Sequence, residues 1–242
     1  MKLPTLVATG LSVILATLFT LTLTAHADAD HPIAYQKRDL EGWTLLINER
    51  LLGSHPTQTA EAIRLLTVQL QVLGKTLPSP ALQKLRQVKL FFNLPYEKAA
   101  PRAEYHPDRG WLETHGRDPE MTRSVEFTNI LIFSDESRRM PILALHELAH
   151  AYHHQVLGHE HSQILALFQA AKASRKYDLV GCWTGKTHVK KRAYALSNAK
   201  EYFAETSEAF FGKNDFQPFD NQELRSMDPT MHSLLGQLWN NP

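Results

Sequence analysis

The sequence predicts an α+β domain with two lobes and a cleft between them, and three observations lead to this prediction. Segments with strand and helix periodicity alternate in the first half of the chain, whereas the second half is mainly helical. Of the 242 residues, 43% are hydrophobic and 21% are charged, which suits one core of ordinary size. Six of the 13 histidines fall within residues 146–161, and this cluster indicates where to look for chemistry.

The amino terminus is predicted to be a secretory signal peptide, residues 1–27. Lys2 precedes an uncharged, largely apolar run over 3–24, and an Ala-x-Ala sequence follows at 25–27. The alternative is an uncleaved membrane anchor, because the run is just long enough to span a bilayer. The small residues at its end favour cleavage. We therefore expect residues 28–242 to be the mature domain, secreted or periplasmic and without stable membrane association.

The first half of the mature chain is predicted to contain three strands and one helix. The strands are 42–47, 87–94 and 124–133, and the helix is 62–73. In the clearest strand, 124–133, Val125 and Phe127 share one face with Asn129, and Glu126 points the other way. The stretch 101–121 is rich in Pro, Gly, His and charge, so we expect a long ordered loop there.

The second half is predicted to be a series of helices. They cover about 141–157, 162–174 and 197–211, and Pro141 suits the first turn of the first of these helices. Asp220 lies three residues before Glu223, which is the spacing of a helix start. The dipeptide Asp228-Pro229 indicates a last helix that runs to Trp239.

One motif within helix 141–157 points to a metal site. It is His146-Glu147-x-x-His150, in which the two histidines lie four residues apart and therefore on one helical face. Two imidazoles about 6 Å apart suit a tetrahedral zinc ion, and Glu147 is placed to take a proton from a water molecule activated by that ion. The neighbouring leucines predict a buried helix, where a metal would offset the cost of burying these polar groups.

A third ligand is expected from a downstream helix. Residues Tyr194, Asn198, Glu201, Glu205 and Glu208 recur at intervals of three and four, which gives one polar helical face. That face alone does not separate Glu201 from Glu205 as a ligand. Asn198 and Glu201 also have the spacing of a helix cap, and in that case Tyr194 precedes the helix.

Taken together, these residues resemble the gluzincin metallopeptidases of the anthrax lethal factor type, a group that includes the secreted Pro-Pro endopeptidases. The resemblance rests on His146-Glu147-x-x-His150, on Tyr194 separated by six intervening residues from the segment Glu201-Tyr202-Phe203-Ala204-Glu205, and on their order, and it covers 124–211. It implies a zincin-like fold, with a small mixed sheet, an active-site helix and a mainly helical lobe. The strand 124–133 would be the sheet edge that lines the cleft.

The resemblance also implies a role for each matching residue. His146, His150 and Glu201 would bind one zinc ion per chain, and Glu147 would be the general base. Tyr194 would donate its hydroxyl group to the oxyanion, and Glu205 would accept a hydrogen bond that orients a ligand histidine.

The sequence therefore predicts a secreted zinc-dependent endopeptidase with a protein or peptide substrate. A zinc hydrolase of a non-protein amide, such as a cell-wall peptide or acylated sugar, is one alternative. A non-catalytic metal-binding interaction protein is another, although Glu147 argues against it. The balance of 26 Lys+Arg and 25 Asp+Glu residues gives no electrostatic reason for nucleic-acid binding.

Three further residues carry weaker expectations. His153 shares the helical face of His146, and we expect it and Asn129 to form local hydrogen bonds. Cys182 is the only cysteine, which excludes a disulfide framework and a thiolate zinc cluster, and nothing beside it marks a nucleophile.

Overall fold

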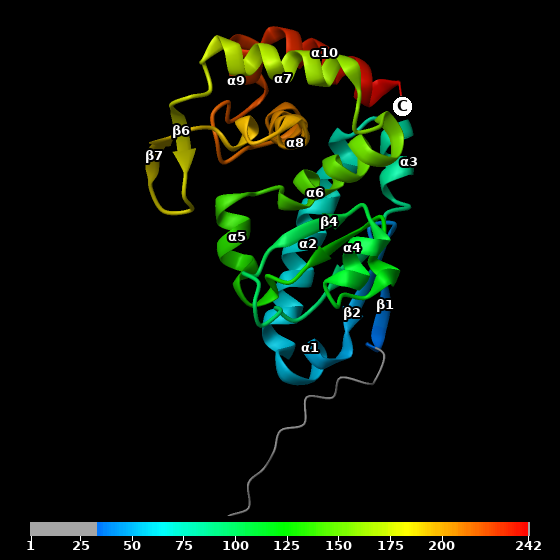
Figure 1. Cartoon of the computed structure of the whole chain (residues 1–242). Helices are drawn as coiled ribbons and strands as arrows, with labels where there is room; N and C mark the ends of the chain where they lie inside the picture. Colours follow the sequence, from blue (N-terminus) through cyan, green and yellow to red (C-terminus); the bar gives the residue numbers. More distant parts are fainter. Residues whose placement is uncertain (1–32, 242) are drawn as a thin grey trace, which may run out of the picture. The chain divides into compact units, whose positions relative to one another are not determined.

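A five-stranded mixed sheet organises the first half of the chain (Figure 1). The structure is a computed structural model that describes residues 33–241, so the predicted signal peptide lies outside the described residues. The strand order is β1-β2-β3-β5-β4. Strands β2, β3 and β5 are mutually parallel, and β1 and β4 pair antiparallel at the two edges. The strands are β1 (Tyr35–Leu40), β2 (Trp43–Asn48), β3 (Leu90–Phe92), β4 (Ala103–His106) and β5 (Ser124–Phe127).

One face of the sheet forms the main core. Leu45, Leu90 and Val125 stand side by side across the three central strands and are fully buried. They pack with the apolar side of α2 (Pro56–Thr76), the predicted helix 62–73 in a longer form. The short helices α1 (Glu49–Ser54) and α3 (Ser79–Leu85) flank α2 in the chain. The apolar periodicity of this region thus correctly indicated the burial of its strands and helix.

The other face of the sheet is covered by the segment expected to be a loop. That expectation was wrong, because 101–121 contains β4, α4 (Arg109–Thr114) and a 3-10 turn (Pro119–Met121). Asp108 begins α4 by accepting a hydrogen bond from the Trp111 backbone N–H. Leu112 and Met121 pack on Phe91 of the sheet. Elements of three to six residues are too short for periodicity to reveal, so composition misled the prediction.

The predicted strand 124–133 is also corrected. The strand ends at Phe127, and the chain continues into a 3-10 turn (Ile130–Ile132) and α5 (Phe133–Arg139). Ile130 and Phe133 are buried, whereas Leu131 and Ile132 are about 40% exposed. The buried residues Ile130 and Phe133 are three apart, which is helical spacing. The same apolar run also fits the alternating pattern of a strand. The strand 124–133 was also expected to be the sheet edge that lines the cleft. In the structure, β5 lies inside the sheet and β4 is the edge strand.

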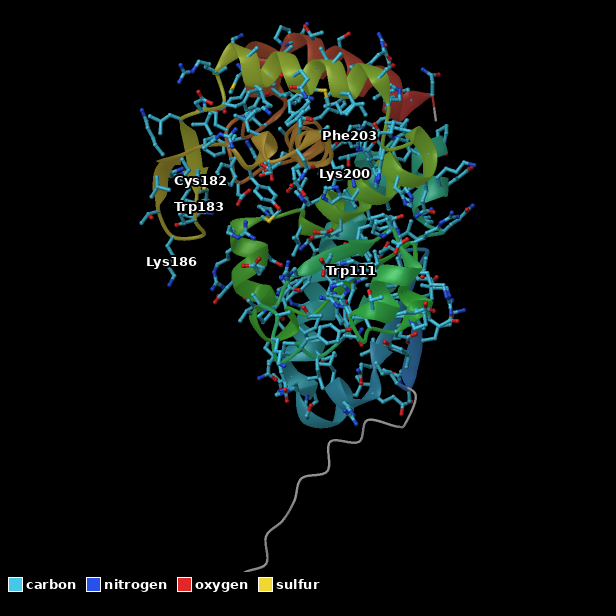
Figure 2. The ribbon with its side chains drawn as sticks, in the orientation of Figure 1. Trp111, Cys182, Trp183, Lys186, Lys200 and Phe203 are labelled. Atoms are coloured by element: carbon cyan, nitrogen blue, oxygen red, sulfur yellow. The ribbon has the colours of Figure 1, made fainter. Side chains whose placement is uncertain are left out.

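The second half of the chain forms a group of helices. They are α6 (Leu143–Tyr152), which continues as a π-helical turn (His153–Leu157), α7 (Ser162–Ser174), α8 (Ala199–Phe211), α9 (Asn221–Met227) and α10 (Pro229–Asn240). The predicted bounds of α7 are confirmed, and Pro141 precedes α6 rather than lying in its first turn. A hairpin of β6 (Val180–Trp183) and β7 (His188–Lys191) adds a small sheet that carries the buried Cys182 (Figure 2).

Aromatic packing fixes the position of α8 against α6. The Trp239 ring of α10 stacks on Tyr152 of α6 at 4.2 Å between centroids and on Phe203 of α8 at 5.8 Å. Tyr202 of α8 donates a hydrogen bond to Asp228, whose carboxylate also caps α10. These contacts hold the two helices that carry the polar residues of interest. Among residues 33–241, every helix is too short or too polar to be a candidate membrane span.

A buried polar cluster around Glu126 gives a stability prediction. Its carboxylate accepts hydrogen bonds from Asn93, Tyr96 and Arg117 at 2.7–3.1 Å, and its other neighbour is His106 at 2.9 Å. Burial raises the pKa of Glu126, but these hydrogen bonds outweigh burial and hold it below its usual value.

We therefore expect Glu126→Gln to lower the free energy of unfolding at pH 7 by about 3 kcal/mol, the low end for a broken buried pair. Because the pKa of Glu126 is lower in the folded state, its contribution is present above the ordinary carboxyl pKa. It is lost as the pH falls through the folded value, so the difference between wild type and variant should begin to shrink near the ordinary carboxyl pKa of about 4 and disappear at lower pH. Urea unfolding at several pH values measures this, with the exposed Glu113→Gln as control. A constant difference at all pH values would contradict it.

Candidate metal centre

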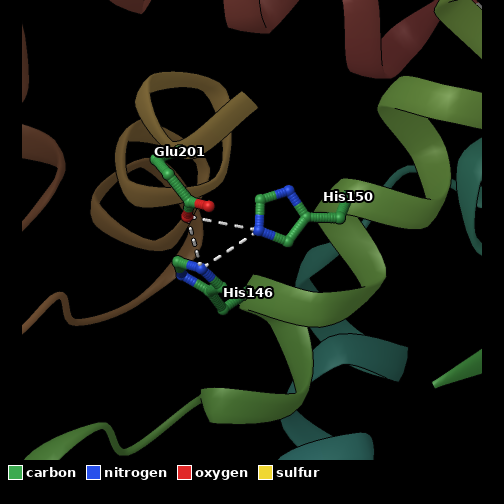
Figure 3. A group of neighbouring side chains, drawn as sticks. All are labelled: His146, His150 and Glu201. Atoms are coloured by element: carbon green, nitrogen blue, oxygen red, sulfur yellow. Dashed lines mark hydrogen bonds and ion pairs between the residues drawn. The ribbon is translucent and has the colours of Figure 1, made fainter. Parts of the chain in front are cut away.

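Helix α6 brings the two motif histidines together. The helix is buried on nearly all sides, and the Nε2 atoms of His146 and His150 lie 3.2 Å apart. Both rings point toward Glu201 at the start of α8 (Figure 3). A fixed helix thus sets the spacing of these two nitrogens without any loop.

Helix α8 brings Glu201 to the same point. Its carboxylate Oε2 lies 3.1 Å from His146 Nε2 and 3.3 Å from His150 Nε2 (Figure 3). The amide oxygen of Asn198 accepts hydrogen bonds from the backbone N–H groups of Lys200 and Glu201 and so caps α8. Of the two possibilities left open above, the cap is confirmed, and Tyr194 lies before α8 in a 3-10 turn (Tyr194–Leu196).

The three atoms fit a zinc ion in both geometry and chemistry. Ligands at the usual zinc distances and a tetrahedral angle are about 3.3 Å apart, which matches this triangle. Burial lowers the pKa of His146, but the charge of Glu208 and the hydrogen bond to Glu201 outweigh it and hold that pKa well above its usual value. The pocket therefore favours positive charge, and a divalent cation would take the place of the proton.

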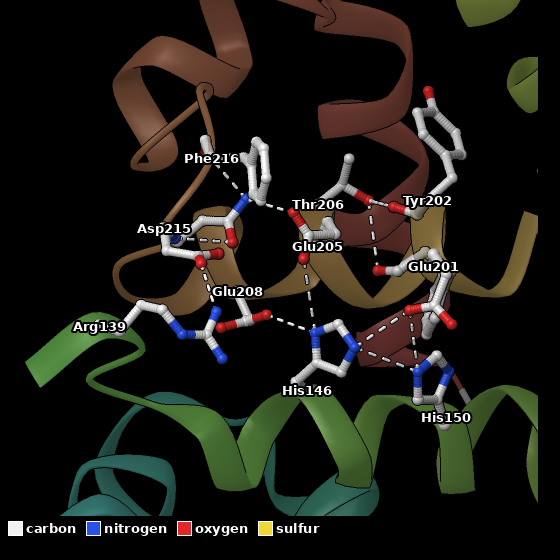
Figure 4. Close-up of polar contacts among 12 residues, drawn as sticks. Arg139, His146, His150, Glu201, Tyr202, Glu205, Thr206, Glu208, Asp215 and Phe216 are labelled. Carbon is white, nitrogen blue, oxygen red and sulfur yellow. Dashed lines mark hydrogen bonds and ion pairs between the residues drawn. The ribbon is translucent and has the colours of Figure 1, made fainter. Parts of the chain in front are cut away.

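The Nδ1 atom of His146 contacts a second layer of carboxylates (Figure 4). It lies 2.6 Å from Glu208 Oε1 and 3.7 Å from Glu205 Oε1. The orienting role that the resemblance implies for Glu205 is thus better placed at Glu208. Glu205 instead accepts a hydrogen bond from Asn214 at 3.1 Å. Because Glu201, Glu205 and Glu208 lie at helical spacing, the polar stripe of the sequence already contained this second candidate.

Glu205 and Glu208 are deeply buried, and burial disfavours their ionised forms. Burial raises the pKa of Glu208, and burial together with the Glu208 charge raises the pKa of Glu205. Nearby Asp215 accepts a hydrogen bond from Arg139 at 2.6 Å (Figure 4). Arg139 also contacts Glu136. The second carboxylate oxygen of Glu208 has no hydrogen-bond partner in the described part of the chain. This region therefore gains from any added positive charge.

The candidate general base is held by the edge strand. Glu147 is 7% exposed, and its Oε2 accepts a hydrogen bond from the Tyr105 backbone N–H of β4 at 2.9 Å. This contact was not foreseen, because β4 was expected to be part of a loop. It places the carboxylate between the sheet edge and the candidate ligands.

Two cavities meet at this point. One has a volume of about 260 Å³ and the other about 320 Å³, and both are lined by His146, Glu147 and Tyr194. Tyr194 is 46% exposed, with its ring centroid 6.4 Å from that of His146. Burial and the charge of Glu201 raise the pKa of the Tyr194 phenol, so it is a hydrogen-bond donor at neutral pH. All three residues border both cavities.

Two sequence expectations about hydrogen bonding were wrong. Both ring nitrogens of His153 and both amide atoms of Asn129 are buried without a hydrogen-bond partner among residues 33–241. Burial, with smaller effects from neighbouring basic groups, lowers the pKa of His153 to about 3, so its ring is neutral. The His153 ring packs against Phe203 at 4.9 Å between centroids, which is an apolar role.

Comparisons with protein-family models, curated proteins and solved structures gave no match to this chain. The likeness to gluzincins thus rests on the matching residues of the sequence.

We expect Glu208→Ala to lower zinc affinity by about 10- to 100-fold, the usual effect of removing a group that orients a ligand histidine. Glu201→Ala should lower it much more, because a donor atom is lost, and Glu205→Ala should lower it least. Competition with a chromophoric chelator gives the affinities, with the exposed Glu113→Ala as control. A larger loss in Glu205→Ala than in Glu208→Ala would assign the orienting role to Glu205.

Proposed function

We propose that the protein is a zinc-dependent endopeptidase of the gluzincin type, with a two-lobed zincin-like fold, that acts outside the cytoplasm. The observation that carries the proposal is the triangle of His146, His150 and Glu201 beside the general-base candidate Glu147. Its edges of 3.1–3.3 Å suit one zinc ion per chain. The order and spacing of Tyr194 and Glu201 in the sequence support the same family.

Zinc bound at this site would supply a Lewis acid and lower the pKa of a water molecule to about 7. The remaining roles fall to the chain. Glu147 lines both cavities and would take the proton of the attacking water and pass it to the leaving amine. The Tyr194 hydroxyl would donate to the oxygen on which negative charge develops. Glu208 would keep the His146 ring in one orientation through Nδ1.

The outer edge of β4 supports a polypeptide substrate over a small amide. The backbone groups of Arg102 and His106 bond inward, to Thr128 and Arg123. The alternate residues Ala103 and Tyr105 therefore present their backbone groups on the outer edge, beside the cavities. An extended peptide can add to such an edge as another strand. A cell-wall peptide or acylated sugar is the second candidate and would be attacked by the same residues.

The Glu147→Gln variant tests the base assignment. We expect it to bind one zinc ion like the wild type and to lower kcat/KM on an unfolded protein substrate by about 10²- to 10⁴-fold, because only the proton acceptor is lost. Metal analysis and digestion of reduced, carboxymethylated protein measure both properties. Peptidoglycan and small acyl amides, assayed in parallel, separate the two candidate substrate classes. Equal activity of variant and wild type would overturn the assignment.

The Tyr194→Phe variant tests the oxyanion role. Removal of one hydrogen-bond donor to a developing oxyanion lowers kcat by about 10²- to 10³-fold in comparable cases. We expect this loss in kcat with little change in KM and none in zinc content, because the Tyr194 hydroxyl contacts charge only in the transition state. A change confined to KM would instead make Tyr194 a substrate-binding residue.

A further inference from the structure

The cavity at the His150 end of the candidate site carries two basic side chains that form no ion pair with an acidic residue in the described part of the chain. Arg102 and Lys200 both line the 260 Å³ cavity and are both exposed. The Arg102 guanidinium makes one long contact, 3.4 Å to the Ala100 carbonyl. The structure shows no hydrogen bond or ion pair for the Lys200 ammonium within 33–241. Figure 2 labels Lys200 at the start of α8.

The acidic residues of the same cavity do not neutralise these charges. Glu104 contacts Arg117 at 2.8 Å, and Glu201 contacts the two histidines. Glu147 accepts from the Tyr105 backbone N–H. The cavity lining holds these three carboxylates beside Arg102 and Lys200. A bound zinc ion would add two further positive charges, and this part of the cleft would then have an excess of positive charge.

Helix stability does not explain Lys200. It is the second residue of α8, where the helix dipole favours an acidic side chain and disfavours a basic one. Its charge also acts on the cavity wall. Burial, and then the charge of Lys200, lower the pKa of His159 to about 4, so that wall histidine is neutral at physiological pH. Lys200 thus occupies an unfavourable position in the first turn of α8, and it lines the cavity.

The 320 Å³ cavity at the other end of the site differs in charge. Arg102 borders this cavity as well, and its other basic residue, Arg139, is matched by Asp215 and Glu136 at 2.6–2.7 Å. Met140, Leu143 and Phe216 add apolar wall. Lys200 lines only the 260 Å³ cavity, whereas Glu136, Glu205 and Asp215 line only the 320 Å³ cavity. A substrate that spans both cavities thus meets more positive charge on the Lys200 side of the reacting bond.

We propose that the substrate is a polypeptide with an Asp or Glu side chain beside the scissile bond, on the side that occupies the Arg102–Lys200 cavity. This inference rests on the proposed endopeptidase function, whose site it deepens. The carboxylate would lie between the guanidinium and the ammonium groups, and the opposite side of the bond would show no acidic preference. Because the charges are solvent-exposed, the preference is modest and depends on salt.

The first experiment is digestion of a degenerate peptide library by the zinc-loaded protein, with the cleaved ends read by mass spectrometry. We expect Glu over Gln and Asp over Asn by about 3- to 10-fold at one position on one side of the cut, as two exposed ion pairs allow. The preference should shrink in 0.5 M NaCl. Equal cleavage of acidic and amide residues, with hydrolysis intact, would overturn the inference and leave the proposed function standing.

Charge reversal assigns the preference to residues. Lys200→Glu and Arg102→Glu should each reduce the preference for acidic residues, and the double variant should favour Lys or Arg at that position. Lys186→Glu is the matched control, since Lys186 lies on the exposed β6–β7 hairpin (Figure 2) and away from both cavities. Zinc content and circular dichroism verify the folding of each variant. A preference that survives both reversals would overturn the inference.

A binding assay separates the failure of this inference from the failure of the proposed function. Fluorescein-labelled pentapeptides that differ by Glu or Gln at one position are titrated into zinc-loaded Glu147→Gln protein. We expect the Glu member to bind more tightly by the same 3- to 10-fold at one position. Such a preference without hydrolysis by the wild type would refute the endopeptidase function and retain the anionic site. Equal binding of all pairs would refute the site.

Discussion

The structure depends on one imidazole ring, that of His146, which is engaged through both nitrogens. Nε2 faces His150 and Glu201, and Nδ1 faces Glu208 at 2.6 Å. The ring therefore joins α6 to two turns of α8, and it can do so only if the two helices keep a fixed separation and rotation. The stacking of Trp239 between residues of the two helices supplies that constraint from the apolar side. A core contact and a polar contact thus fix the same geometry.

The arrangement has an energetic cost that a cation would offset. Glu205, Glu208 and Asp215 are nearly inaccessible to water, and the pKa of each is raised by burial. Burying carboxylates is costly unless positive charge lies close by. Arg139 contacts Asp215, but the nearest basic group to Glu208 is the His146 imidazole at 2.6 Å, and Glu205, which accepts from the Asn214 amide, lies 3.7 Å from the same ring. A divalent ion on the far side of that imidazole would stabilise the ionised forms through the ring, so metal binding and folding of this region should be coupled.

The sequence predicted longer helices such as α2 and α7 because their apolar periodicity extends over several turns. It also named the residues that converge, since an i, i+4 pair on a buried helix has one geometry. It failed where short elements decide the structure: β4 is four residues long, and α5 follows a run that satisfies both alternation and helical spacing. The choice between Glu205 and Glu208 as partner of His146 depends on the rotation of α8 against α6. Contacts far apart in sequence set that rotation, so no local pattern reveals it.

The edge strand β4 contacts Glu147, the proposed base, and also provides the surface on which a peptide would lie. Successive residues of an edge strand point their backbone groups alternately inward and outward, and Ala103 and Tyr105 are the outward pair. The Tyr105 N–H is already used by Glu147, so an added peptide would pair with the edge beside Ala103 and pass in front of the carboxylate. The strand would then position both reactants, the peptide through its free backbone groups and the base through a hydrogen bond that fixes its carboxylate.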